Sequence, residues 1–324
     1  MQKFAFKNTE SVTNAVSLLK SGKAAVLAGG TDILSLLKTE ALSPSPELLV
    51  NIKNIPGLDT ISKDNGVSKI GALTRISAVA SSELIKAEYP ALAEAAGSIA
   101  APVIRNMATI AGNLCQEVQC WYFRRSFLTG NMFDCLRKGG KQCYAVSGDN
   151  RYHAILGGKG CCAVCPSDIA VILMALDATI ITSKQRIPIE GFYEVMGNSL
   201  DSDEIITGIE IPHTPPETRQ KFLKFTLRPA LDFSIVSAAA MITINDNTVT
   251  DSRIVLGAVA PTPYRAVYAE ESLKGKTIDE STAEMAGVEA VRNATPLSKN
   301  RYKVQIAKTL VKRAILACNP SSVD

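Results

Sequence analysis

The features that direct proteins to membranes, nucleic acids or the secretory route are scarce in this 324-residue sequence. The longest apolar run, at residues 169–176, is far too short to span a bilayer, and the first ten residues lack the apolar core of a signal peptide. The net charge is only +4, and no basic run with interleaved aromatic residues suggests nucleic acid or a membrane surface as a partner. We therefore expect a cytoplasmic protein, which would reach the periplasm only on a partner subunit's export signal.

Catalytic constellations are also scarce. The chain has no Ser/His/Asp or Cys/His arrangement of the kind that nucleophilic catalysis needs, and its two histidines, His153 and His213, are isolated. Neither a Walker A loop nor a GxGxxG fingerprint occurs, so the P-loop and Rossmann interpretations lose support. We expect both histidines to be structural and expect no catalytic residue in this chain.

Apolar periodicity predicts alternating helices and strands in the first hundred residues, as in α/β folds. A helix at 166–178 is apolar on every side and is therefore expected to be buried. After the proline-rich segment at 211–217, strands precede helices, which predicts an α+β domain. The expected helices are 9–22 (capped by Thr9), 31–40, 77–100 with a break near Pro90, 166–178 and 301–318; the expected strands are 24–30, 48–52, 69–73, 221–228, 233–244 and 252–260.

The cysteines are unevenly distributed. Seven of the eight lie between residues 115 and 165, and only Cys318 stands apart. A secreted disulfide scaffold would be a small domain with cysteines throughout, whereas clustered cysteines in a long chain indicate reduced thiolates that hold a metal or a cluster. The surrounding segment, 116–165, shows neither helical nor strand periodicity, and such a long irregular segment is usually functional or disordered. Its aromatic residues and cysteines argue against disorder.

Two glycine turns join strands to helices. In LAGGTDIL, residues 27–34, backbone amides beside a helix N-terminus suit a phosphate, because glycine lets the anion approach the amides closely. For this stretch alone, a tight turn without a ligand is the better interpretation. TIAGN, residues 109–113, is a second turn of the same chemistry. Together the two turns are suited to the two phosphates of a dinucleotide.

Five motifs follow one another along the chain: LAGGTDIL, IRNMATIAGN, PSD, KFTLR and GAVAPTPYRA. In this order the chain resembles the FAD-binding medium subunit of the xanthine dehydrogenase family of molybdenum hydroxylases, over nearly its whole length. The resemblance implies an α+β protein. A two-subdomain FAD-binding domain of the vanillyl-alcohol-oxidase (PCMH) type would span residues 1–216 and include the segment 116–165. A C-terminal domain like that of the CO dehydrogenase flavoprotein would span residues 217–324.

The resemblance also implies which residues hold FAD. Gly29, Gly30 and Thr31 would contact the pyrophosphate, Asp168 the flavin nucleotide, and Lys224 would lie beside the isoalloxazine ring, where a cation favours the reduced anionic ring. The alternative for Lys224 is a solvated strand charge, and for Ile205 and Ile206 it is ordinary strand core. The full set carried over is Ala25, Val26, Leu27, Ala28, Gly29, Gly30, Thr31, Asp32, Ile33, Ile104, Ala108, Thr109, Gly112, Asn113, Asp168, Ile205, Ile206 and Lys224.

The segment 116–165 resembles the iron–sulfur insertion of two subgroups, the flavoprotein subunits of 4-hydroxybenzoyl-CoA reductase and of periplasmic aldehyde oxidoreductase. This resemblance implies a [4Fe–4S] cluster near FAD, with Cys161 preferred and Cys162 or Cys165 as substitutes for the fourth ligand. We expect Cys115 to be a small packed residue beside the turn and Cys318 to be core. The implied ligands are Cys120, Cys135, Cys143 and Cys161.

The resemblance implies an electron-transfer subunit that does not itself hold the substrate. Its partners would be a [2Fe–2S] small subunit and a molybdopterin-containing large subunit, paired as a dimer of heterotrimers, with a ferredoxin-like or other electron carrier outside. Electrons would flow from the molybdenum subunit to FAD and on through [4Fe–4S], or in the reverse direction in a reductase of the benzoyl-CoA type. A rival of another class is a non-redox scaffold that binds zinc and serves only assembly.

Overall fold

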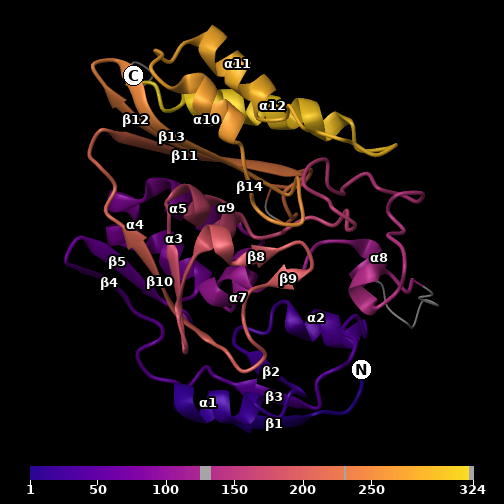
Figure 1. The fold of residues 1–324 in the computed structure, drawn as a ribbon. Helices are drawn as coiled ribbons and strands as arrows, with labels where there is room; N and C mark the ends of the chain where they lie inside the picture. The colour runs from indigo at the N-terminus through magenta and orange to yellow at the C-terminus, as the bar shows by residue number, and fades with distance from the viewer. Residues whose placement is uncertain (125–132, 230, 321–324) are drawn as a thin grey trace.

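The computed structural model describes residues 1–124, 133–229 and 231–320, and residues 125–132 of the predicted insertion lie outside them. The elements form an N-terminal parallel sheet, a central antiparallel sheet with helices, and a C-terminal sheet covered by helices (Figure 1). This mixture of one parallel and several antiparallel sheets confirms the predicted α+β class. No helix in the described residues is long and apolar enough to cross a membrane.

The N-terminal sheet has the order β1-β3-β2, and its strands pair in parallel. Ala15 and Leu19 are buried on the helix that follows β1, and they pack with Val50 of the central strand. The helix starts after Ser11, whose side chain accepts a hydrogen bond from the backbone N–H of Asn14, so the predicted cap at Thr9 is wrong. The elements are β1 (Ala5–Asn8), α1 (Val12–Leu19), β2 (Ala24–Leu27), α2 (Ile33–Lys38) and β3 (Leu48–Asn51).

The central sheet is antiparallel and has the order β4-β5-β10-β6-β7. Every residue of α9 is buried, as its uniformly apolar sequence predicts. The segment 77–100 breaks at Pro90 as predicted and also at Ser82, which caps a second short helix. The strands are β4 (Ile61–Asp64), β5 (Val67–Gly71), β6 (Thr179–Thr182), β7 (Arg186–Pro188) and β10 (Ile206–Pro212); the helices are α3 (Ile76–Ser81), α4 (Glu83–Glu88), α5 (Pro90–Ser98), α6 (Pro102–Arg105), α7 (Ile110–Leu114) and α9 (Asp168–Ala175).

The C-terminal sheet lies between two helical layers. Helices α10, α11 and α12 cover one face, and α5 and α9 of the central region contact the strands from the other side (Figure 1). Ala307, Val311 and Ala314 of α12 are buried in this core, and α12 lies within the predicted helix at 301–318. The elements are β11 (Thr218–Phe225), β12 (Val236–Asn245), β13 (Thr248–Gly257), β14 (Tyr264–Arg265), α10 (Val267–Leu273), α11 (Glu280–Glu289) and α12 (Tyr302–Leu316).

The described part of the insertion is mostly irregular, as predicted. It contains α8 (Trp121–Arg124) and the 3-10 turn η2 (Leu136–Lys138), and two short strands, β8 (Tyr193–Glu194) and β9 (Gly197–Asn198), follow later in the chain. Side chains from the C-terminal region hold it in place. The Asn300 side-chain amide donates to the carbonyls of His153 and Ala154, and the buried Lys303 Nζ donates to the carbonyls of Tyr152 and His153. The insertion is therefore packed against the C-terminal region.

Candidate functional site

The two predicted glycine turns lie side by side and line one cavity of about 250 Å³, here called the glycine-turn cavity. The first turn follows β2, and the second forms the start of α7, where Thr109 Oγ1 accepts a hydrogen bond from the backbone N–H of Gly112 at 3.2 Å. The two turns are separated by about eighty residues of sequence, yet both face the same space. Their predicted convergence is thus present in the structure.

Gly29 and Gly30 explain why the first turn requires glycine. A Cβ on Gly29 would lie 2.1 Å from the carbonyl oxygen of Met107, so only glycine allows the two turns to approach this closely. Gly30 has a φ of +74°, a left-handed conformation that other residues adopt at a cost. Glycine at these two positions therefore lets the backbone of the first turn pack directly against the segment that leads into the second turn.

The first turn also offers backbone donors. Within the described residues, no backbone N–H from Gly29 to Asp32 donates a hydrogen bond to a backbone or side-chain acceptor. Buried or cleft-facing amides normally have partners, so this run of open donors is suited to an anionic ligand. The open backbone N–H groups of this turn therefore fit a phosphate-binding role.

The Asp32 carboxylate serves the scaffold. It accepts a hydrogen bond from Arg124 Nη1 at 2.7 Å and another from the backbone N–H of Glu117 at 3.0 Å. Arg124 also donates to the carbonyl of Val118 at 2.9 Å, so the first glycine turn is tied directly to the start of the insertion. The sequence motif contains Asp32, but its partner 92 residues away is visible only in the structure.

The cavity lining includes some predicted residues and omits others. Sequence reasoning missed several apolar lining residues, among them Leu36, Leu42 and Leu200, because lone leucines carry no motif signal. Cys115 lines the cavity beside the turn, where its surface is exposed, while burial of the thiol among protein atoms raises its pKa to about 12. The predicted residues that line the cavity are Val26, Ala28, Gly29, Gly30, Thr31, Asp32, Ile33, Thr109, Gly112, Ile205 and Ile206; those that do not are Ala25, Leu27, Ile104, Ala108, Asn113, Asp168 and Lys224.

Asp168 and Lys224 contact each other. The Lys224 Nζ lies 2.9 Å from Asp168 Oδ2, and the two side chains are only 8% and 5% exposed. The other carboxylate oxygen of Asp168 accepts hydrogen bonds from the hydroxyls of Ser234 at 2.6 Å and Ser237 at 3.0 Å. Lys224 is therefore a buried half of an ion pair, and the alternative of a solvated strand charge is wrong.

The four predicted cluster cysteines line one small cavity, here called the cysteine cavity. Cys135 and Cys161 are buried, and Cys120 and Cys143 are partly buried. Aromatic and aliphatic side chains, including Tyr122 and Phe123, and the charged Arg137 complete the lining. Three separate parts of the insertion thus bring their thiols to a common, mostly apolar space.

The remaining cysteines lie outside this lining. The Cys162 thiol donates a hydrogen bond to the sulfur of Cys143, which lowers the pKa of Cys143, and Cys162 does not line the cavity. Cys165 is buried elsewhere, and burial raises the pKa of its thiol to about 12. Cys318 is buried in the C-terminal core, as predicted.

His153 stands beside one of these thiols. Its Nε2 lies 3.2 Å from Cys120 Sγ, while its Nδ1 is buried without a hydrogen-bond partner in the described residues. Burial, together with the nearby Lys303 ammonium, lowers the pKa of His153 to about 4. The imidazole is therefore neutral at pH 7, which fits the expected structural role.

A single-ion site is absent from residues 1–124, 133–229 and 231–320, since no three His, Cys, Asp or Glu side chains there converge enough to hold one metal ion. The four thiols instead surround a space. A [4Fe–4S] cubane needs one thiolate for each of its four irons, and the four cysteines that line this cavity match that number.

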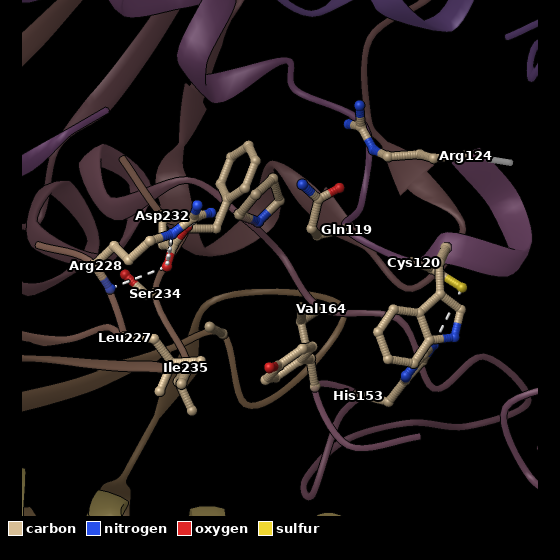
Figure 2. A pocket seen from close by; sticks show the side chains of 15 residues that line it. Gln119, Cys120, Arg124, His153, Val164, Leu227, Arg228, Asp232, Ser234 and Ile235 are labelled. Carbon is tan, nitrogen blue, oxygen red and sulfur yellow. Dashed lines mark hydrogen bonds and ion pairs between the residues drawn. The ribbon is translucent and has the colours of Figure 1, made fainter. Parts of the chain in front are cut away.

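A larger cavity of about 670 Å³ lies between the insertion and the connection from β11 to β12. Figure 2 shows Arg228, Asp232 and Ser234 on one side and Cys120 and His153 on the other. The two charged groups pair with each other, with 2.6 Å between Arg228 Nη2 and Asp232 Oδ1. Ser234, on one side of this cavity, donates to Asp168, and Cys120, on the other side, also lines the cysteine cavity.

Two family models match the chain. The FAD binding domain in molybdopterin dehydrogenase matches residues 2–214, and the CO dehydrogenase flavoprotein C-terminal domain matches residues 221–318. Together they cover almost all of the sequence.

Curated relatives align over nearly their full length. The aldehyde oxidoreductase FAD-binding subunit PaoB of Escherichia coli (strain K12) is 31% identical, with 95% of this chain and 96% of the relative covered. The carbon monoxide dehydrogenase medium chain of Hydrogenophaga pseudoflava is 27% identical, with 97% and 96% covered. The solved carbon monoxide dehydrogenase from that organism, a form that lacks the Mo-pyranopterin moiety, superposes with a TM-score of 0.79 at 26% identity and covers 98% of this chain and 97% of its own.

Proposed function

The chain belongs to the FAD-binding subunits of the molybdopterin dehydrogenases, and from this membership we propose that it passes electrons between FAD and a [4Fe–4S] cluster within a molybdenum hydroxylase. Membership makes it the flavin-binding subunit of an oxidoreductase. The observation that carries the finer proposal is that four cysteines, all in the segment directly after the second glycine turn, line one cavity.

The residues of the glycine-turn cavity are suited to hold FAD. When bound, FAD supplies a two-electron carrier and a [4Fe–4S] cluster a one-electron carrier. The open backbone donors of Gly29, Gly30 and Thr31 would bind the pyrophosphate, and the Thr109 hydroxyl would bind it from the second turn. Ile206 supplies an apolar wall.

The Asp168–Lys224 pair modifies the expected role of the lysine. In our proposal this pair lies at the flavin end of the site, but the Asp168 carboxylate already neutralises the ammonium at 2.9 Å. A neutral pair stabilises an anionic ring less than a lone cation would. The pair would therefore orient groups around the flavin and would add little net positive charge beside the ring.

We assign the cluster to Cys120, Cys135, Cys143 and Cys161, because these cysteines line the cavity and Cys162 and Cys165 do not. We keep 1–216 and 217–324 as the proposed domain limits.

The proposed partners are a [2Fe–2S] small subunit and a molybdopterin-containing large subunit. The aldehyde oxidoreductase subunit is the relative at 31% identity, which supports oxidation of substrate on the large subunit and electron flow outward through this chain. The alternative is a reductase of the 4-hydroxybenzoyl-CoA type, in which electrons enter from a ferredoxin-like donor. Rapid mixing with an aldehyde separates the two, because only the oxidative enzyme has its flavin bleached by that substrate.

Purification of the complex with its partner subunits tests the cofactor content. We expect one flavin for each copy of this chain and, after reduction with dithionite, the EPR signal of a [4Fe–4S] cluster in addition to that of any [2Fe–2S] centre. A complex that contains zinc and no such signal would support the assembly scaffold and refute the proposed electron-transfer role.

A further inference from the structure

One side chain reaches both candidate cofactor cavities through its contacts. Arg137, in η2, lines the cysteine cavity, and its Nε donates a hydrogen bond to Cys161 Sγ at 3.3 Å. Its Nη1 lies 3.7 Å from Glu117 Oε2, and Glu117 lines the glycine-turn cavity. A single guanidinium therefore lies between a thiol of one cavity and a carboxylate of the other.

The guanidinium is held rigidly. The Arg137 side chain is only 5% exposed, and its Nη2 donates to the backbone carbonyl of Val195. The backbone N–H of Glu117 donates in turn to Asp32 of the first glycine turn at 3.0 Å. The three partners of Arg137, namely Cys161, Glu117 and Val195, come from different segments of the sequence and together fix the guanidinium between the two cavities.

We propose that Arg137 is a positioning residue that holds the Cys161 sulfur and, together with Glu117, sets the redox potential of the cluster. This inference rests on the proposed function. Reduction adds negative charge to a cluster and to its thiolate ligands, and an N–H···S hydrogen bond from a cation favours that charge. A buried cation acts strongly because little water screens it. Arg137 should therefore raise the potential of the cluster.

Glu117 has the opposite effect. Its carboxylate lies 3.7 Å from the Arg137 guanidinium and offsets part of the positive charge. Removing Glu117 leaves Arg137 with its hydrogen bond to Cys161 and a larger net charge. Substitution of Arg137 and substitution of Glu117 should therefore shift the redox potential of the cluster in opposite directions.

The test is redox titration of the purified complex, followed by EPR, in the native protein and in variants. Arg137→Gln should make the cluster potential more negative, Glu117→Gln should make it more positive, and Arg137→Lys, which keeps the charge without the fixed fork of donors, should lie between native and Arg137→Gln. Arg228→Gln is the matched control, because Arg228 is 72% exposed and pairs with Asp232. Its cluster potential should equal the native one.

The possible outcomes distinguish a failure of the proposed function from a failure of the role proposed for Arg137. A native complex without a [4Fe–4S] signal refutes the proposed function itself. A native cluster whose potential is the same in Arg137→Gln, at unchanged iron and flavin content, refutes only the role of Arg137. If Arg137→Gln does not retain its cluster, Glu117→Gln decides, since it leaves the contact to Cys161 intact: a more positive potential supports the inference, and an unchanged or more negative one overturns it.

Discussion

The buried ion pair of Asp168 and Lys224 provides a direct test of the structure, because removing one residue leaves the other as a buried charge without its partner. In Lys224→Met the Asp168 carboxylate, whose side chain is 5% exposed, loses its cation and keeps only the hydroxyls of Ser234 and Ser237. Breaking a buried ion pair from one side costs about 3–5 kcal/mol. The two hydroxyls offset part of this, so we expect a loss of about 3 kcal/mol in the free energy of unfolding.

The reverse substitution, Asp168→Asn, leaves the Lys224 ammonium buried, with the carbonyl of Ser98 as an acceptor at 3.1 Å. We expect a loss of similar size. The double variant leaves no unpaired charge and should lose about 3–4 kcal/mol, less than the sum of about 6 kcal/mol for the two single variants. The cycle should therefore give a coupling energy of about 2–3 kcal/mol.

Urea unfolding followed by circular dichroism measures these differences. With a slope of about 3 kcal/mol per molar urea, a loss of about 3 kcal/mol lowers the midpoint by about 1 M. Lys69→Met is the matched control, since Lys69 pairs with Asp64 on exposed strands, where both side chains are about half exposed, and should cost less than about 1 kcal/mol. A Lys224→Met midpoint equal to that of Lys69→Met, or additive losses in the double variant, would refute the pairing.

Four further outcomes are expected. Cys135→Ala should lose the cluster signal in EPR, while Cys115→Ala, whose thiol lines the other cavity, should keep it; the opposite pattern contradicts the ligand assignment. Acid precipitation should release all the flavin, and flavin left on the pellet would show a covalent link. Gly29→Ala should lose flavin, because its Cβ would meet a carbonyl at 2.1 Å, whereas Gly191→Ala, with open space around it, should retain the native flavin-to-protein absorbance ratio. Burial lowers the pKa of Lys303 to about 7, so above pH 7 the Lys303 amine takes up a proton when the protein unfolds. The free energy of unfolding should therefore rise from pH 7 toward pH 10. In Lys303→Met, urea midpoints measured at pH 7 and pH 9 should show a smaller rise.

Elements with strong periodicity could be predicted from the sequence. The uniformly apolar segment at 166–178 forms the buried helix α9, and the striped segment at 301–318 forms α12. The ends of elements were predicted less well. They depend on which polar side chain captures a free backbone N–H, and the sequence offers both Thr9 and Ser11 at the start of α1. The structure uses Ser11, a choice that propensity does not decide.

Long-range partners could not be predicted. Asp32 and Asp168 carry motif signals, but the sequence gives no reason to pair the first with Arg124 or the second with Lys224. Such pairs depend on how subdomains pack, and a single sequence contains no direct measure of that. The alternative of a solvated charge at Lys224 fails for this reason, since its partner Asp168 is not evident until the sheets are assembled.

The described part of the insertion is also held by long-range contacts that could not be predicted from the sequence. Thiolate ligation is one reason for an irregular, cysteine-rich segment to fold, but the structure adds another at its C-terminal half. Asn300 and Lys303 reach from the region before and within α12 to carbonyls of residues 152–154, and Ile155 and Leu156 pack into the C-terminal core. Asp32 and Arg124 hold the N-terminal half to the first glycine turn. The insertion is thus fixed at one end to the turn proposed to bind FAD and at the other to the C-terminal region. Electron transfer between two carriers requires a short and constant separation, and in our proposal a segment fixed at both ends maintains that separation between FAD and the cluster.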